Sequence, residues 1–460
     1  MNKREFLALG GAVPLMLAGC GGNGSGNAPT RLVNASVGYP GPMGFMDEST
    51  QITTGVTYGE ASPYFNIEAG SVHLTLTTTV GGVESSATAA QLRTVVKDQR
   101  YSLVAYGILD ELRLALVAES NTTPDAGTAS VNVLNTSADI GSVDVYLSTT
   151  KDLSVSTQIA SSVGATTTSP AQSPFATDIQ PGSYYITVVG AGSIARGISD
   201  VRFQTPAPIT LAALQVLTVI LTPGVSGVLA NAILLTQGTT GTAVSYTNTT
   251  ARVRAVTAVP GHATSVIGAT SAGTVVNVLN SNTTQKVSNY FVVGTGAAPT
   301  VTVDGATIPV LMDSTDATTG VTTEVAASLS AGGDYTIMVY LNGSTPVAKL
   351  IEDDNTAPTT AAGVKFRLVN LASDNQSLQL SMYVNGSSIA QNVPYGTASG
   401  YTEVPNVPQA TDSTVDINDG AVLLNERKLV IPLGNIFTDF VVSVPTPTSA
   451  LTLLQPTAGT

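Results

Sequence analysis

A short motif recurs four times along the chain, and this repeat restricts the fold more than any other feature. In each copy apolar and polar residues alternate and then give way to a small polar turn. The copies are RLVNAS (Arg31–Ser36), VNVLNTS (Val131–Ser137), RVRAVTAVP (Arg252–Pro260) and FRLVNLAS (Phe366–Ser373). With Asn34, Asn135, Thr257 and Asn370 as equivalents, the spacings are 101, 122 and 113 residues. Such spacings match a domain rather than a solenoid repeat, so we expect four domains in tandem.

The segments after each copy alternate with a period of two, which is the pattern of β-strands. They are rich in Val, Ile, Thr and Tyr, and Gly, Pro and Asn separate them. The clearest runs are Ser71–Val80, Tyr101–Leu109, Gly182–Gly190, Gln215–Thr222, Thr300–Gly305 and Asp334–Gly343. A helical period is scarce, and Ala87–Val96 is the best candidate for a helix or a short turn. We therefore predict an all-β chain of four tandem immunoglobulin-like β-sandwich domains.

The segments between the expected domains suggest a further grouping. Glu119–Val133 and Asp353–Val369 share an Asn-Thr-x-Pro core, and each leads into a copy of the motif. The join at Thr236–Thr250 is longer and has a different sequence. We therefore expect domains one and two, and domains three and four, to form two rigid pairs on a looser hinge. The predicted boundaries are a signal peptide at 1–19, a flexible tether at 20–29 and β-sandwich repeats at 30–118, 128–236, 250–353 and 363–456.

The N-terminus has a basic region followed by an apolar stretch over Phe6–Leu17. A membrane-spanning helix needs about 20 apolar residues, so this shorter stretch is typical of a signal peptide. It ends in LAGC, which resembles the lipobox of bacterial lipoproteins and holds the only cysteine, Cys20. The resemblance implies cleavage after Gly19 and a diacylglycerol on the Cys20 thiol, which anchors the chain to a membrane. Gly21 in the next position is similar to lipoproteins of the outer membrane of diderm bacteria.

Charge and composition exclude several classes of function. The chain has 18 basic and 31 acidic residues and a net charge of −13, whereas a nucleic-acid-binding face is basic. Two His and one Cys are too few for a zinc or iron–sulfur site, so we expect no metal and no cofactor. Trp is absent, which disfavours an aromatic platform for sugars.

The candidates for chemistry are two histidines and three acidic clusters. His73 lies in an expected strand and His262 in an expected turn, each without a second His or a Cys nearby. We interpret both as surface or partly buried polar positions and predict no catalytic residues. The acidic clusters are Asp47-Glu48, Asp110-Glu111 and Glu352-Asp353-Asp354. They fall in expected turns and linkers, where we expect them to be solvated; a calcium site at the third cluster remains the alternative.

Two other recurring residues receive structural interpretations. Asn34 and its equivalents are expected to form turns, because Asn tolerates left-handed backbone and bonds nearby backbone groups. Tyr58 and Tyr395 each precede a Gly, and we expect them to pack beside that turn rather than bind a ligand.

The repeated motif, the Tyr-Gly segments and the linkers together resemble the tandem domains of unknown function 4397 (DUF4397) of bacterial envelope proteins. The closest segments are Ala129–Leu147 and Leu350–Ser373. The first repeat departs from the family after its motif, with GYPGPMGFM over Gly38–Met46 in place of the usual strand, and the third lacks the Asn. The family brings no catalytic residues, so the resemblance supports fold and location only.

These observations favour a non-enzymatic, lipid-anchored cell-envelope protein that presents tandem sandwiches for adhesion, scaffolding or protein–protein contact. The expected partners are the membrane, through Cys20, and an envelope protein or glycan. The alternative is a polysaccharide-binding module or a hydrolase at the same surface. A pocket that gathers Asp or Glu from one repeat would favour the alternative, and four pocketless sandwiches would favour the scaffold.

Overall fold

The computed structural model describes residues 26–37, 39, 42–80, 83–107, 112–166, 170–192, 200–238, 242–270, 273–282, 284–315, 320–360, 362–405, 407–408, 412–432, 434–443 and 452–454. Within them the regular secondary structure is β-strand, apart from one helical element, the 3₁₀ turn η1 (Leu153–Val155). The strands form four successive units, each with two main sheets around its own apolar core. The predicted all-β fold of tandem sandwiches is confirmed.

Each unit has one sheet that contains the repeated motif, here called the head sheet, and a second sheet, here called the outer sheet. In unit 1 the head sheet has the order β4 (Phe65–Glu68), β1 (Asn27–Asn34), β8 (Tyr101–Tyr106), β9 (Arg113–Ala118). The outer sheet has the order β3 (Thr50–Val56), β2 (Met43–Asp47), β5 (Gly70–Val80), β6 (Val83–Ser86), with β7 (Gln91–Val95) also on β5.

Unit 2 repeats this plan, with two more strands in the head sheet than unit 1. Its head sheet has the order β13 (Ala171–Gln172), β10 (Ala129–Asn135), β18 (Val216–Gly224), β19 (Gly227–Thr236), β20 (Ala243–Tyr246), with β14 (Ala176–Ile179) also on β10. Its outer sheet has the order β12 (Thr157–Val163), β11 (Val143–Ser148), β15 (Gly182–Gly190), β16 (Val201–Gln204), with β17 (Ile209–Leu211) also on β15.

Unit 3 has the largest head sheet. Its order is β24 (Lys286–Val287), β21 (Thr250–Thr257), β32 (Asp334–Asn342), β33 (Thr345–Asp353), β29 (Val310–Thr315), β30 (Thr322–Ala326), with β25 (Phe291–Gly294) also on β21. The outer sheet has the order β23 (Val275–Ser281), β22 (Thr264–Ala269), β27 (Thr300–Val303), β28 (Ala306–Ile308). A separate two-stranded sheet joins β26 (Gly296–Ala297) and β31 (Ser328–Leu329).

Unit 4 closes the array. Its head sheet has the order β37 (Thr397–Ala398), β34 (Val364–Asn370), β41 (Ile436–Ser443), β42 (Thr452–Leu454), with β38 (Thr402–Val404) also on β34. Its outer sheet has the order β36 (Ser387–Pro394), β35 (Gln379–Val384), β39 (Ser413–Asp419), β40 (Val422–Leu429).

The same parallel pairing recurs in all four head sheets. The motif strands β1, β10, β21 and β34 lie parallel to β8, β18, β32 and β41, respectively. Parallel strands are usually buried on both faces. That holds here: Leu32 of β1 packs into the core of unit 1, whereas Val33 packs on the opposite face against unit 2.

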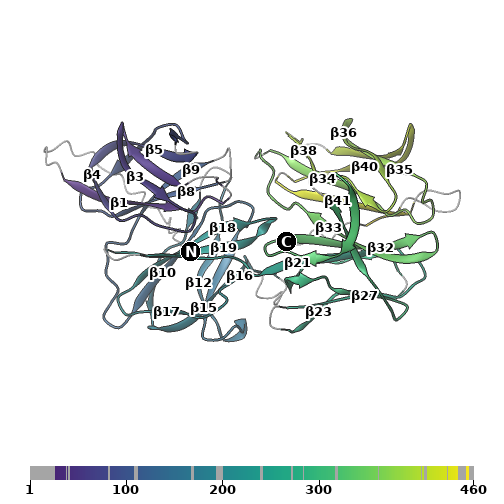
Figure 1. Cartoon of the computed structure of the whole chain (residues 1–460), viewed down its shortest axis with the longest axis horizontal. Coiled ribbons are helices and arrows are strands. Elements are labelled where there is room, and N and C mark those ends of the chain that lie inside the picture. The colour runs from purple at the N-terminus through teal and green to yellow at the C-terminus, as the bar shows by residue number, and fades with distance from the viewer. Residues whose placement is uncertain are drawn as a thin grey trace, which may run out of the picture.

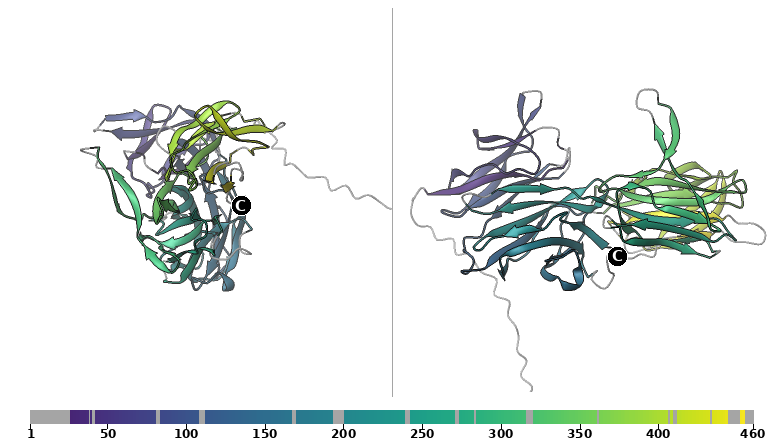
Figure 2. Two further views of the ribbon diagram at one scale, coloured as in Figure 1. Left: turned by 90° about the vertical axis from the view of Figure 1, so that its right-hand side faces the viewer. Right: turned by 60° about the horizontal axis from the view of Figure 1, so that its bottom comes forward.

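The units are stacked in two pairs. Figure 1 shows units 1 and 2 together on one side of the molecule and units 3 and 4 together on the other, and the right-hand view of Figure 2 shows the same division. Within each pair the head sheets pack against each other, so the expected pairing is confirmed.

Three local expectations are wrong. The candidate helix at Ala87–Val96 contains instead the strand β7, which pairs with the Gly70–Leu74 part of β5. The strand expected to be missing after the first motif is present as β2, in the place that β11 occupies in unit 2. The join Thr236–Thr250 contains β20, which pairs with β19 through backbone hydrogen bonds and is therefore part of unit 2 rather than a free linker.

Candidate functional site

The first candidate site is the contact between the head sheets of units 1 and 2. Its centre is an apolar cluster distinct from the core of either unit. Unit 1 contributes Val33, Ala35, Val104 and Val117, and unit 2 contributes Leu134, Ile220, Ile233 and Leu235. All eight side chains are buried. Burial of apolar surface is the main favourable term in most associations, so this cluster holds the two units together.

The contact between units 3 and 4 repeats the arrangement with equivalent strands. Unit 3 contributes Val256, Ala258 and Met338, and unit 4 contributes Val369, Leu371, Phe440 and Val442. The equivalence shows that pairing is a property of the repeated unit and not of one accidental surface.

A buried ion pair lies beside the first apolar cluster. The Arg31 Nε donates to Ser102 Oγ at 3.1 Å and to Glu119 Oε1 at 2.9 Å, and both ionic side chains are almost fully buried. Tyr64 adds a hydrogen bond from its hydroxyl to Glu119 Oε2 at 2.5 Å, and its ring lies 4.7 Å from the Arg31 guanidinium. Arg31 Nη2 also donates to the Thr236 carbonyl of unit 2, at 3.1 Å. The guanidinium therefore ties the two units together.

The same cluster occurs in unit 3, where one carboxylate serves both units of the pair. Asp353 accepts hydrogen bonds from Thr336 at 2.5 Å and from the Tyr290 hydroxyl at 2.6 Å. Arg254 of unit 3 lies 3.5 Å from Asp353, and Arg367 of unit 4 donates to Asp353 Oδ1 at 2.8 Å. Two buried guanidinium groups thus converge on one buried carboxylate across the interface.

The pairing also has a reciprocal contact from unit 3 to unit 4. Arg254 Nη2 donates to Thr438 Oγ1 at 3.1 Å, and Thr438 is the β41 neighbour of Arg367. Tyr401 stacks on Arg367 at 5.0 Å, as Tyr290 does on Arg254 at 4.7 Å. Each unit of the pair therefore brings an Arg, a Thr and a Tyr to the same polar cluster.

Unit 2 carries an uncharged version of the cluster. Asn132 takes the place of the Arg, and its Oδ1 accepts from Thr218 Oγ1 at 2.7 Å. Gln237 takes the place of the acid, donating to Thr218 at 2.9 Å and accepting from the Ser120 backbone N–H at 2.9 Å. At the contact between units 1 and 2 the described residues thus share one buried charge pair, whereas those at the contact between units 3 and 4 share three charged groups.

The tyrosines of these clusters stay protonated. Burial raises the pKa of Tyr290 well above its ordinary value. Burial also raises the pKa of Tyr64, and the hydrogen bond from Tyr64 to Glu119 raises it further. Phenols with raised pKa values act as hydrogen-bond donors to the carboxylates and not as bases.

Two further tyrosines cross the interfaces. Tyr58 bonds through its hydroxyl to Thr222 of unit 2 at 2.8 Å, and Tyr395 donates to the Leu341 carbonyl of unit 3 at 2.6 Å. The glycines that follow them, Gly59 and Gly396, have φ angles of 83° and 73°. The expectation that both tyrosines pack beside Gly turns is confirmed, and their role is to join the units of each pair.

The repeated Asn forms the expected turn. The Asn34 Nδ2 donates to the Val56 carbonyl at 3.0 Å, and its Oδ1 accepts from the backbone N–H two residues later. Asn135 and Asn370 make the equivalent bonds, to Val163 and Val393. Each Asn thus ties the end of a head strand to the neighbouring outer sheet.

The two histidines lie apart. His73 is exposed on β5, and His262 lies in a turn where its Nδ1 is 2.7 Å from Asp304 Oδ2. This contact and the Ala263 backbone N–H lower the pKa of Asp304 below its ordinary range. The described part of the chain holds no cluster of three metal-ligating side chains.

The expectation for the acidic clusters is partly wrong. Glu352 and Asp354 are exposed, but Asp353 between them is only 3% exposed and carries the polar cluster of units 3 and 4. Glu119, at the matching linker, is likewise buried. The alternation of side chains between the two faces of the strand continues to Asp353 and to Glu119, so both side chains point into the interface. Asp47 is the last residue of β2 and is half-buried, and Glu48 is exposed in the turn that follows. Asp110, Glu111 and Cys20 lie outside the described residues.

The arginines that join the units were not predicted from the sequence, although a signal for them existed. Arg31, Arg254 and Arg367 each stand three positions before the equivalent of Asn34. A basic residue that recurs at one register position of an otherwise apolar strand is a candidate for a buried ion pair.

The two pairs are also in contact, at the turn between β18 and β19. Ser226 Oγ accepts a hydrogen bond from the Asp334 backbone N–H at 2.8 Å, and the Ser226 N–H donates to the Gly332 carbonyl at 3.2 Å. Asp139 Oδ1 accepts from the Ala357 N–H in the linker between units 3 and 4, at 2.6 Å. The join between the pairs is thus braced by hydrogen bonds and differs from the expected loose hinge.

Comparison with known proteins adds a family but no activity. No curated protein matches the chain. One family model matches about a quarter of it, from the first motif strand to β11 of unit 2, so the match includes unit 1, the first linker and the second copy of the motif. Residues 28–146 are thus similar to the family that the model describes, a domain of unknown function (DUF4397).

Proposed function

We propose that this protein is a non-enzymatic scaffold of the bacterial cell envelope that presents its outer sheets for adhesion or protein–protein contact. The observation that carries the proposal is the burial of the head sheets in two equivalent pair contacts. Because each head sheet is occupied by its neighbour, the outer sheets are the surfaces left for partners. A braced array of sandwiches presents those surfaces in fixed relative directions.

The distribution of reactive groups supports a scaffold over a hydrolase. Some deeply buried charged groups, such as Glu119 and Asp353, serve the contacts between units, whereas Asp144 and Asp439 bond groups of their own unit. The two histidines lie on different units. A cavity in unit 3, lined by residues of β22, β25 and β31, has no Asp or Glu among its described lining residues. A glycoside hydrolase needs two carboxylates that flank its substrate.

In this proposal a diacylglycerol on Cys20 holds the array on the outer membrane of a diderm bacterium. The support is the similarity of LAGC to a lipobox and the apolar stretch before it. Among the described residues, no helix has the length and apolar character to cross a bilayer.

The anchor is tested by Cys20→Ser, with Gly24→Ala in the tether as the matched control. We expect Cys20→Ser to move the protein out of the detergent phase or to leave it unprocessed, because this thiol is the only one in the chain. Gly24→Ala should partition like the wild type. Unchanged partitioning of the Cys20→Ser protein would refute the lipid anchor.

The scaffold role is tested by photo-crosslinking in intact envelopes, with the crosslinker placed at exposed positions of the outer sheets. We expect discrete products with the wild type and with the double variant His73→Ala, His262→Ala. A variant with one pair loosened, Asp353→Ala, should lose products from units 3 and 4. If the double His variant folds normally but loses these crosslinked products, an imidazole does chemistry and the non-enzymatic proposal is wrong.

A further inference from the structure

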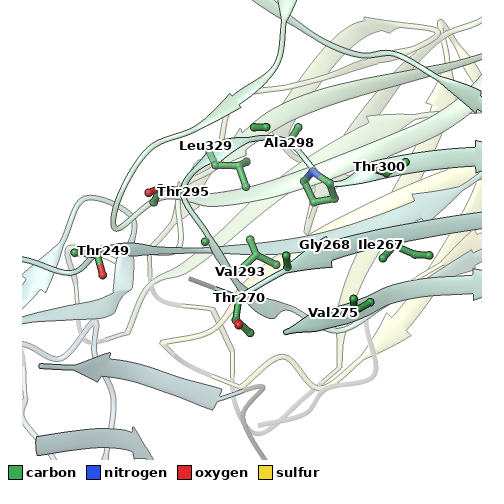
Figure 3. Close-up of a pocket in the computed structure, with 14 residues that line it drawn as sticks. Thr249, Ile267, Gly268, Thr270, Val275, Val293, Thr295, Ala298, Thr300 and Leu329 are labelled. Carbon is green, nitrogen blue, oxygen red and sulfur yellow. The ribbon is translucent and has the colours of Figure 1, made fainter. Parts of the chain in front are cut away.

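A cavity of about 740 Å³ opens in unit 3, beside the join to unit 2. Its walls come from the end of β22, the start of β23, the end of β25, the segment before β27, and β31. Figure 3 shows Leu329 and Ala298 on one side of the space and Val293 and Ile267 on the other. A volume of this size is in the range of small-molecule sites.

A break in one strand opens this cavity. In units 1 and 2 the corresponding outer strands, β5 and β15, run without interruption. In unit 3 Ala298 and Pro299 separate β26, which pairs with β31, from β27, which pairs with β22. Proline has no N–H to donate to a ladder, so the sheet divides at this point and leaves a gap between its two parts.

The floor of the cavity depends on a glycine. A Cβ placed on Gly268 would lie 2.8 Å from Val293 Cγ1, closer than carbon atoms approach. The close packing of Gly268 on Val293 leaves the space above them free. Val293 and Leu329 are 1% and 4% exposed and form the deep wall, whereas Ile267 and Val275 are 42% and 71% exposed at the mouth.

The lining has a consistent chemistry. Its described residues include no charged side chain and no aromatic ring. The polar side chains are the hydroxyls of Thr249, Thr270, Thr295 and Thr300. A charged group would lose hydration here and find no side chain of opposite charge, and a sugar would find no ring to stack on. An aliphatic chain has no charge whose hydration could be lost, and its burial against Val, Ile and Leu side chains is favourable.

We propose that this cavity is a binding site for the alkyl chain of a small lipid-like molecule, with the polar head left in solvent at the mouth formed by Ile267 and Val275. The site belongs to unit 3 alone and does not depend on the scaffold role. The exposed apolar side chains at the mouth extend the buried wall outward, so a chain longer than the cavity remains covered along part of its length.

The test uses the protein without its signal peptide and with Cys20→Ser, titrated with an undecyl chain that carries a dansyl group. Saturable binding with a blue-shifted emission is expected. Ala298→Trp fills the cavity, and Val275→Glu places a charge at its mouth; each should weaken binding by at least about tenfold, a change in free energy of about 1.4 kcal/mol. The matched controls are Ala306→Trp on exposed β28 and Val422→Glu on exposed β40, which should bind like the parent.

Three outcomes would overturn the proposal. The first is the absence of saturable binding below the concentration at which the probe self-associates. The second is equal weakening by the cavity variants and by their controls. The third is displacement of the probe by a Val-rich peptide but not by undecanol, which would assign the cavity to an apolar protein segment. Circular dichroism and thermal melting of each variant separate loss of binding from loss of folding.

Discussion

At the scale of single residues, the pairs of units depend on buried charges that satisfy one another. Asp353 accepts from Thr336, Tyr290 and Arg367, while Arg254 lies within 3.5 Å. Breaking a buried ion pair by removing one partner is costly, because the other charge stays buried without compensation. The neighbouring Asp354 bonds Lys365 at 2.9 Å but is half exposed, where solvent screens the pair.

These two adjacent aspartates make a matched comparison. We expect Asp353→Ala to destabilise units 3 and 4 by about 3–5 kcal/mol, because two guanidinium groups lose their shared carboxylate. Asp354→Ala should cost less than about 1 kcal/mol. Thermal and urea unfolding of the full chain, followed by a probe in unit 4, measure the difference. Similar stabilities of the two variants would contradict the role given to Asp353.

A second residue-scale effect concerns the linker between units 3 and 4. Glu403 accepts hydrogen bonds from the backbone N–H groups and the hydroxyls of Thr359 and Thr360, at 2.8 to 3.0 Å. Burial by itself would raise the pKa of Glu403, but these hydrogen bonds lower it below the ordinary value of 4.5. The ionised carboxylate therefore holds the linker on unit 4.

This predicts an acid-sensitive linker. Because the folded pKa is depressed, the stabilisation is present above the unfolded pKa and is lost over the pH range below 4.5, as the pH falls through the folded pKa. Limited digestion with an acid-active protease should cut near Thr359 and Thr360 more readily as the pH falls across that range. In the Glu403→Gln variant the protease should cut the linker readily at every pH tested. A cleavage rate in the variant that follows the same pH curve as the wild type would disprove the assignment.

At the scale of elements, the head sheets explain why the motif strands are buried on both faces. Alternate residues of β1 point to the core of unit 1 and to unit 2, so each strand serves two apolar clusters. The linker from Asn121 to Gly127 is mostly exposed and contributes little to these clusters. The contact between units 1 and 2 therefore does not require the linker to be intact.

A cut in this linker tests that conclusion. A recognition site for a specific protease, inserted between Asn121 and Gly127, should allow complete cleavage without separation of the two parts. We expect the fragments to elute together in gel filtration, because the apolar cluster and the bond from Arg31 to Thr236 remain. Combined with Arg31→Ala, which leaves Glu119 buried without its partner, the same cut should release unit 1. Immediate separation of the fragments without that substitution would mean that the linker holds the pair.

At the scale of the whole molecule, the relative placement of the two pairs depends on a close backbone approach. Gly227 has a φ of 97°, and a Cβ there would lie 2.8 Å from the Asn355 carbonyl oxygen and 2.9 Å from Thr356 Cα. Gly127 has a φ of 83° but open space around it. The two glycines have similar backbone conformations and differ in what they face.

We expect Gly227→Ala to push the pairs apart and Gly127→Ala to leave their placement unchanged. The strain of a positive φ is common to both variants, so a difference between them reports the contact with Asn355 and Thr356. Small-angle scattering, or the distance between spin labels on units 2 and 3, measures the change. Equal distances in both variants would show that the turn between β18 and β19 does not set the arrangement.

The sequence by itself determined the strands, the four units and the turns between them. A period of two requires alternate side chains to lie on opposite faces, and Asn and Gly supply turns through their own backbone preferences. Both properties are local, so the motif strands and the turn at Asn34 could be predicted without knowing their neighbours. The candidate helix at Ala87–Val96 failed because pairing with β5 outweighed a weak local pattern.

Only the tertiary structure decided which face of each head sheet meets another unit. Alternation shows that Arg31 and Val33 share a face, but it does not show whether that face meets water or a second sheet. The contact between units converts Arg31, Glu119 and Asp353 from apparent surface charges into a buried network. The cavity of unit 3 depends in the same way on strands far apart in the chain, because the break at Pro299 opens a space only where β22, β25 and β31 surround it.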